Sequence, residues 1–398
     1  MIPRPLPRAC SRLLSRGATR CRAAIAWSAL ALAVLGMPRM GWAQANLSGQ
    51  GLGYPPGQLS ARSLGAAGAI AEMDPLSQVN PAAISLVGAT TLFFQIEPEF
   101  RRVTSGAATD RTTTARYPLF TAAIPVGAQW VFGVSSATLL DRTWTTSTRS
   151  DVVLGGETVG STFKYGSDGS INDLRVAAAW TPVSWAHVGL GGHLVSGSDR
   201  VFVGRTFDSP AFGGFADTSV IGFDGGAVSA GVELVAPRLA TFAASFRKGA
   251  KLNATRSDTA LGSGRVPDRF GASLAYIGVA GTQIAARTSL DKWSSLANLR
   301  RGSVHAVDAW DSSVGADIAG PRFGSQSIML RTGVRWRTLP YKAAGNKVRE
   351  RSLSGGLGAL FAGGRVLTDV TLTRAQRDAG LPVNEKAWTL SIGLGVRP

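Results

Sequence analysis

The chain of 398 residues has two cysteines, three histidines and no long apolar segment beyond its N-terminal region. Cys10 and Cys21 both lie close to the N-terminus, so the rest of the chain has no thiol for a disulfide or a thiolate metal site. After residue 45 no segment offers the ~20 consecutive apolar residues of a membrane helix, and strongly helical stretches are scarce. These absences exclude a disulfide-stapled domain and a helical membrane protein.

The first 45 residues have the features of a signal peptide. Arginines without any acidic residue precede a short apolar run, 23–35, which is too short to span a bilayer comfortably. Ala43-Gln44-Ala45 is a small-x-small cleavage site, and it predicts Asn46 as the first residue of the mature chain. The alternative is a retained membrane anchor.

Acidic residues are also few, because 25 Asp and Glu stand against 42 Lys and Arg and leave a formal net charge of +17. A basic chain can bind nucleic acid. Here the arginines are scattered at alternate positions rather than clustered, and the chain carries an export signal, so we expect no nucleic-acid partner. The charge fits an arginine-lined interior and contact with anionic outer-membrane lipid and lipopolysaccharide.

The chain has instead a sustained alternation with a period of two residues. In 388–397, WTLSIGLGVR, large apolar residues take every second position and small or polar residues take the others. Side chains alternate between the two faces of a β-strand, so this segment predicts one apolar and one polar face. The pattern recurs along most of the chain and predicts a transmembrane antiparallel β-barrel, all-β, with lipid outside and water or solute inside.

We predict a barrel of about fourteen strands over residues 89–398. The predicted strands are 90–102, 117–125, 130–142, 172–181, 185–205, 219–235, 239–250, 266–277, 281–292, 303–316, 326–341, 347–361, 364–376 and 386–397. Short connections alternate with long ones, such as 143–171 and 251–265, as is typical of outer-membrane barrels. An even number of strands puts both termini on the periplasmic side of the bacterial outer membrane.

The polar face carries the candidate lumen-lining residues. These are Glu97, Glu99, Arg287, Arg331, Arg335, Arg365 and Asp369. A charge on the lipid face near the midplane costs ~2–4 kcal/mol, so we expect these residues to face the lumen. Because both signs occur, we interpret them as an internally paired network rather than a substrate site.

Most of the tryptophans near strand ends are expected to anchor the barrel at the membrane interfaces rather than to bind a ligand. They are Trp130, Trp180, Trp185, Trp293, Trp336 and Trp388.

The spacing of the histidines and of the possible catalytic residues does not favour a metal site or an active site. His187 and His193 share a face of one predicted strand but stand ~20 Å apart along it, so they cannot bind one metal. Ser303, His305 and Asp308 could suggest a hydrolase, but at this spacing the acid points to the opposite face of a regular strand. We expect neither an enzyme nor a cofactor.

Residues 46–88 lack the alternation and are rich in Gly, Ala and Pro. The segment LGAAGAIAEMDPLSQVNPAAI (64–84) resembles the FadL family of outer-membrane transporters for long-chain fatty acids and other hydrophobic compounds. That family begins with a Gly/Ala-rich hatch that ends in Asn-Pro-Ala before the first strand, and here the motif is Asn80-Pro81-Ala82. The simpler alternative is a turn, which Asn-Pro initiates well.

Two further segments carry the resemblance. VPDRFGASLAY (266–276), followed by Trp293-Ser294-Ser295, is similar to a glycine-bearing strand of the family. LPYKAAGNKVRERSLSGGLG (339–358) is similar to a loop and strand of FadL-like barrels, including the PorV-type group.

The resemblance implies a fourteen-stranded barrel plugged by a hatch, 46–88, and inserted by the barrel-assembly machinery. In the family, hydrophobic substrates enter from outside, meet the hatch and leave through an opening in the wall. This chain is shorter than typical fatty-acid transporters, lacks a long apolar external loop and ends in Arg397-Pro398 rather than an aromatic residue.

Two hypotheses about function follow. The first is a channel for passive uptake of hydrophobic or amphipathic small molecules, gated by the hatch. The second is a PorV-type structural or secretion-associated barrel whose loops bind proteins. An apolar pocket between hatch and wall would favour the first, and a charged, plugged lumen without such a pocket would favour the second.

Overall fold

The computed structural model describes residues 52–106, 108–257, 259–299, 306–323 and 326–398. The predicted signal peptide, the first residues of the predicted hatch, Ser303 and His305 lie outside this range. None of the helices in the described part of the chain is long or apolar enough to cross a membrane.

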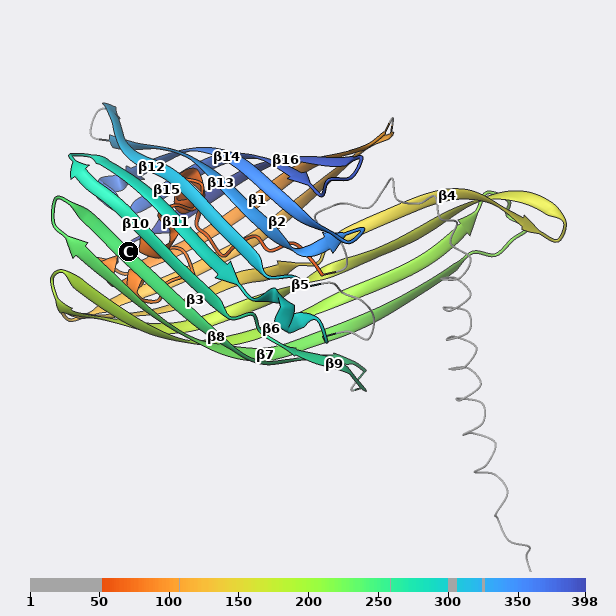
Figure 1. The fold of residues 1–398 in the computed structure, drawn as a ribbon, viewed down its shortest axis with the longest axis horizontal. Coiled ribbons are helices and arrows are strands. Elements are labelled where there is room, and N and C mark those ends of the chain that lie inside the picture. Colours follow the sequence, from red (N-terminus) through yellow and green to blue (C-terminus); the bar gives the residue numbers. More distant parts are fainter. Residues whose placement is uncertain (1–51, 107, 258, 300–305, 324–325) are drawn as a thin grey trace, which may run out of the picture. The chain divides into compact units, whose positions relative to one another are not determined.

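Fourteen strands of the described chain form a closed antiparallel barrel (Figure 1). They are β1 (Thr91–Ser105), β2 (Ala108–Val126), β3 (Trp130–Asp141), β5 (Glu157–Val183), β6 (Ala186–Phe207), β7 (Phe215–Ala236), β8 (Ala240–Arg256), β10 (Arg269–Val279), β11 (Thr282–Asp291), β12 (Ala309–Phe323), β13 (Gln326–Ala343), β14 (Asn346–Phe361), β15 (Val366–Asp378) and β16 (Val383–Val396). Each strand pairs with its neighbours in the wall, and β1 pairs with β16 to close the barrel. Each of the fourteen predicted strands overlaps one wall strand, so the predicted fold is confirmed.

Two further strands extend the wall at the end with the long hairpins. β4 (Trp144–Leu154) pairs with the first half of β5, and β9 (Thr259–Arg265) pairs with the end of β8. The long connections predicted over 143–171 and 251–265 therefore contain strands of their own. Threonine and valine are frequent in β4, and these β-branched residues favour an extended backbone even where neither face is apolar.

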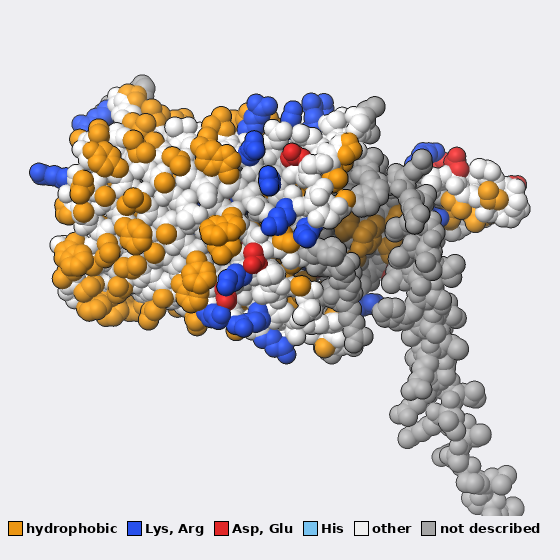
Figure 2. Space-filling model, in the orientation of Figure 1, with side chains coloured by type: hydrophobic (Ala, Val, Ile, Leu, Met, Phe, Trp, Pro, Cys, Tyr) orange, Lys and Arg blue, Asp and Glu red, His pale blue; other side chains and the backbone are white. Residues whose placement is uncertain are grey.

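The alternation predicted from the sequence separates an apolar outer face from a polar inner one. In β16, Trp388 and Leu394 are exposed on the outside, whereas Thr389 and Ser391 are buried. Figure 2 shows that hydrophobic side chains cover the outer surface towards the short-turn end of the barrel and that a group of Lys and Arg side chains borders them.

Most of the predicted interface tryptophans lie on this outer surface. Five of them are 39–54% exposed: Trp130, Trp180, Trp185, Trp336 and Trp388. Trp293 is the exception, because it is only 3% exposed and cannot anchor the barrel at an interface. The short helix η4 (Trp293–Leu296) turns this ring inward, where it joins an apolar cluster with Leu296 and Leu339.

The segment before β1 lies inside the barrel and contributes no wall strand (Figure 1). It contains α2 (Ala61–Gly65), η2 (Ala71–Met73) and η3 (Ala82–Leu86). The helix α2 packs against β13 to β16, whereas η2 contacts β8 and β10, and η3 contacts β3, β5, β6 and β7. Different parts of the hatch thus touch different sides of the wall and fill the space between them.

Candidate functional site

The Asn80-Pro81-Ala82 motif forms the last turn of the hatch before the wall. The Asn80 side chain is fully buried; its oxygen accepts a hydrogen bond from the Ala82 amide at 3.0 Å, and its nitrogen donates to the Glu72 carbonyl at 2.7 Å. Pro81 has φ −66° and precedes η3 directly. The asparagine therefore ties two parts of the hatch together, and the proline begins the helix that leads to β1.

Two glycines of the wall face this motif. Gly189 of β6 and Gly231 of β7 are directly opposite each other in the sheet. A Cβ atom on Gly189 would overlap the backbone of Pro81 and Ala82, and one on Gly231 would overlap the side chain of Asn80. Only glycine allows this close approach of hatch and wall. Sequence analysis missed this pair, because glycines are frequent in the strands and nothing local distinguishes these two.

Glu72 of η2 is the main acidic anchor of the hatch. Its buried carboxylate accepts hydrogen bonds from Arg269 at 2.5 Å, Ser245 at 2.6 Å and Arg287 at 3.2 Å. Burial raises the pKa of Glu72, but the two guanidinium groups and the Ser245 hydroxyl outweigh it, so the pKa lies below its ordinary value. The carboxylate is thus charged at neutral pH and joins the hatch to β8, β10 and β11.

Tyr54, near the start of the described hatch, lies among four guanidinium groups. The guanidinium carbons are 4.4 Å (Arg377), 4.9 Å (Arg116), 4.9 Å (Arg337) and 6.0 Å (Arg101) from the ring centroid. All four lie within the range in which a cation is attracted to an aromatic face. The Tyr54 hydroxyl also accepts from Arg337 and donates to Glu350. We call these residues and their carboxylate partners the Tyr54 cluster.

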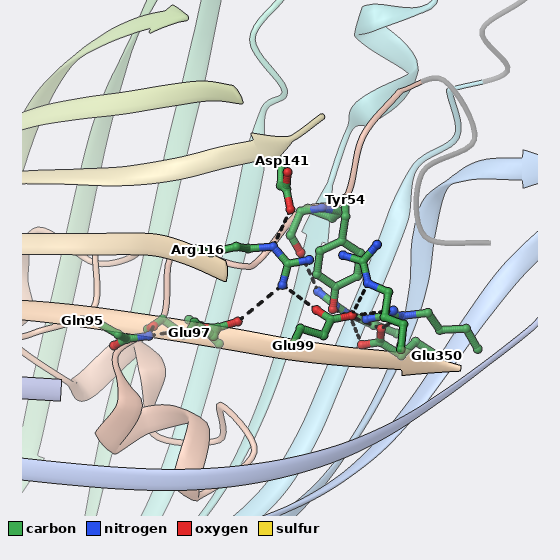
Figure 3. A network of polar contacts seen from close by, with 12 residues as sticks. Tyr54, Gln95, Glu97, Glu99, Arg116, Asp141 and Glu350 are labelled. Carbon is green, nitrogen blue, oxygen red and sulfur yellow. Dashed lines mark hydrogen bonds and ion pairs between the residues drawn. The ribbon is translucent and has the colours of Figure 1, made fainter. Parts of the chain in front are cut away.

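The carboxylates of the Tyr54 cluster balance its arginines (Figure 3). Glu99 accepts from Arg101 at 2.7 Å and from Arg377 at 2.8 Å, and Arg116 bridges Glu99 and Asp141. Arg377 also pairs with Glu350 and Glu385, and Glu97 lies 3.9 Å from Arg116. A layer of paired charges on β13 to β16 and β1 to β3 therefore surrounds Tyr54 of the hatch, towards the long hairpins.

The other candidate lumen residues are buried inside the barrel, with one exception. Arg331 pairs with Asp369 at 2.5 Å, and Arg335 and Arg287 share Asp311 at 2.7 and 3.1 Å. Arg365, expected in the lumen, is exposed. It follows the turn η5 (Ala362–Gly364), in which both glycines have positive φ, so the strand alternation begins only after it.

Apolar side chains lie on both sides of these charges. A cavity of about 280 Å³ lies between the hatch and β13 to β15, close to the short-turn end, with Leu76, Leu86 and Leu360 in its lining. At the opposite end, inside the long hairpins, the apolar cluster around Trp293 includes Phe223, Leu252 and Tyr341. Along the lumen, a packed apolar cluster is therefore followed by the Tyr54 cluster, the hatch and the cavity.

The histidines hydrogen-bond to separate partners. His193 contacts Asp173 and Ser229, both at 2.8 Å, and His187 contacts Thr181 at 2.9 Å. No group of three or more potential metal ligands is found among the described residues. His187 and His193 are therefore wall residues held by hydrogen bonds to their neighbours.

Comparisons with known proteins agree with this architecture. A scan against protein-family models and a search of curated proteins each find no match. Among solved structures, a FadL homologue of Pseudomonas aeruginosa has a TM-score of 0.59 at 12% sequence identity, covering 87% of this chain and 99% of that one. The P. putida toluene transporter TodX (TM-score 0.55, 12% identity, 89% and 99% covered) and the Ralstonia pickettii toluene transporter TbuX (0.52, 13%, 88% and 99%) are also similar. The described chain therefore has the fold of a FadL-like barrel.

Proposed function

We propose that the protein is an outer-membrane channel for passive uptake of hydrophobic or amphipathic small molecules, with the hatch as its gate. The carrying observation is the cavity of about 280 Å³ between hatch and wall, because a purely structural plug would pack without it. The proposed process is diffusion, with no catalytic step and no cofactor. The partners are the solute, the outer membrane and the barrel-assembly machinery.

The apolar outer face supports this location. Each of the fourteen wall strands is paired on both sides, and the side chains exposed towards the short-turn end are largely apolar. Such a surface is stable in a bilayer and unfavourable in water.

The size of the cavity favours a compact solute. Its volume is just below the ~300–1,000 Å³ of typical small-molecule sites. A one-ring aromatic hydrocarbon fits this space more readily than an extended long-chain fatty acid. Two of the structurally similar proteins are described as toluene transporters, which supports the same solute class.

The PorV-type structural barrel is the second candidate, and the Tyr54 cluster is the observation that favours it. Paired charges along half of the wall oppose the passage of an apolar solute unless the hatch and its arginine partners move together. Since Tyr54 belongs to the hatch, one displacement can open both barriers.

Uptake by whole cells tests the proposal. Cells that express the protein should take up radiolabelled toluene faster than cells without it, and deletion of residues 50–85 should raise ion conductance in planar bilayers while the wall stays folded. The structural alternative would be favoured by two results together. Toluene uptake would be equal with and without the protein, and the folded deletion variant would have unchanged conductance.

A further inference from the structure

Four cations lie in one row across five neighbouring strands of the outer surface, and Gln376 separates two of them. Arg102 of β1 is directly opposite Arg111 of β2 on one side and Lys386 of β16 on the other. Lys386 is opposite Gln376 of β15, which is in turn opposite Arg351 of β14. All five side chains are exposed. We call Arg111, Arg102, Lys386 and Arg351 the basic row.

This arrangement is unfavourable without a counter-charge. Residues directly opposite each other in a sheet have Cβ atoms ~4.5–5.5 Å apart, and like charges there are destabilising. Within the described part of the chain, no ion pair is found for any of the four, whereas Arg116 and Arg377 inside the barrel each contact several carboxylates. In the next row outward, Asp378 is opposite Arg349 and accepts from the Gly380 amide.

The basic row lies at the edge of the apolar band. The next row towards the short turns contains Phe100 and Trp388, which are directly opposite each other and about half exposed. Trp336 is directly opposite Arg351 and is also exposed on the outer surface. Aromatic side chains of this kind mark the membrane interface, so the row stands where lipid headgroups lie.

The position along the barrel identifies the leaflet. Arg102 is eleven residues from Thr91, the start of β1, which is about 26–31 Å along the axis at the usual rise and tilt. That height is just beyond an apolar band of ~25 Å measured from the short-turn end. With the short turns in the periplasm, the row faces the outer leaflet, and Figure 2 shows Lys and Arg side chains along this border.

We propose that the basic row is a binding site for the phosphate groups of lipid A, the glycolipid anchor of lipopolysaccharide. Arginine presents a planar fork of donors that matches a phosphate, and lysine adds a point charge. The row spans four strand-to-strand steps, ~19 Å in all, which suits a ligand with more than one phosphate. Acyl chains of the bound lipid would lie against Phe100 and Trp388, in the next row towards the short turns. The inference rests on the proposed outer-membrane location and not on transport.

Titration of the purified full-length protein with lipid A in detergent, followed by native mass spectrometry, tests the site. Replacing all four residues by glutamine should weaken lipid A binding about tenfold or more. Dephosphorylated lipid A should bind the original protein as weakly as lipid A binds the variant. The matched control is Arg200→Gln, an exposed outward arginine of β6 that lies opposite Asp168 and should bind lipid A unchanged.

The folded state is checked in the same experiment. Because the substitutions remove like-charge repulsion, the lipid-free variant should remain a heat-modifiable barrel, and the pair Arg102→Gln with Lys386→Gln provides a milder variant. Unchanged lipid A affinity in either folded variant would overturn the assignment, as would equally tight binding of phosphatidylglycerol. Toluene uptake is measured in a separate experiment. If the channel proposal fails there, the lipid A binding result still tests the basic row.

Discussion

The wall and the hatch of this barrel are held in place by different kinds of contact. Each wall strand pairs along its length with two neighbours, and the register closes between β1 and β16. The hatch has three short helical elements and reaches the wall mainly through side chains such as Glu72 and Tyr54. Its backbone makes one isolated bridge, Tyr54 with Asp141, among the described residues. Stability of the wall and docking of the hatch should therefore be separable.

The largest expected effect on the hatch comes from its acidic anchor. Glu72→Gln keeps the size of the side chain but leaves the guanidinium groups of Arg269 and Arg287 without their shared carboxylate. Breaking a buried pair in this way costs about 3–5 kcal/mol. We expect the hatch to undock while the wall stays folded, seen as increased conductance in planar bilayers with unchanged heat-modifiability.

Acid should reproduce this effect in the unmodified protein. Because the pKa of Glu72 is lowered in the folded state, its contribution is fully present above its ordinary pKa and is lost as the pH falls through the lowered value. Conductance should be low at neutral pH and rise only in strongly acidic solution. A Glu72→Gln variant that keeps the same acid-induced rise would show that another group controls docking.

A lipid-facing charge should affect the wall instead. Val370 of β15 is exposed on the outer face, near the middle of the apolar band, so Val370→Arg should cost ~2–4 kcal/mol of barrel stability. Urea unfolding in lipid vesicles measures this loss. Leu394→Arg, closer to the short turns, should cost less because lipid-face penalties fall towards the interface.

The adjacent residue sharpens the contrast between wall and hatch. Thr371 points inward and donates to the Ala61 carbonyl of α2 at 2.7 Å. Thr371→Arg should displace the hatch and raise conductance, with a smaller loss of wall stability than Val370→Arg. Equal unfolding free energies for the two variants would contradict the separation of faces.

The fold was predictable because the wall strands carry a local signal. A period of two over ten or more residues fixes both the strand and the side that each residue faces, as Leu372 and Thr371 illustrate. The two-residue period no longer predicts side-chain direction where the backbone is not a β-strand. Arg365 precedes the first residue of β15, and Trp293 lies in a helical turn, so the parity of neighbouring residues says nothing about their direction.

The site was less predictable because its contacts are distant in sequence. Glu72 meets Arg269 and Arg287 across about 200 residues, and Tyr54 meets Arg337 and Glu350 across nearly 300. Nothing in the aperiodic segment before β1 marks either residue as a partner of those arginines. The Asn80-Pro81-Ala82 motif could be found because its three residues are consecutive and resemble a known family pattern, whereas its contacts with Glu72 and the wall could not.

Wall glycines provide a matched test of hatch docking within one strand. Gly189→Ala of β6 would place a methyl group in the backbone of Pro81 and Ala82, and overpacking of this kind costs about 1–3 kcal/mol. Gly192→Ala of the same strand adds a methyl group where nothing lies within 4 Å. We expect the first variant to raise conductance and protease sensitivity of the hatch and the second to resemble the original protein. Identical behaviour of the two would show that the hatch is not seated on this wall.

The smallest expected effect concerns the proline of the motif. Pro81 has φ −66°, which alanine also adopts, so the main effect of Pro81→Ala is to free the chain when the hatch is undocked. This freedom is worth about 0.4–1 kcal/mol, which corresponds to a two- to fivefold increase in the frequency of opening events in single-channel recordings. Asn80→Ala loses the hydrogen bonds to Ala82 and Glu72 and should open the channel more often than Pro81→Ala. If Pro81→Ala opened it as often as Glu72→Gln, the turn itself, rather than side-chain pairing with the wall, would hold the hatch closed.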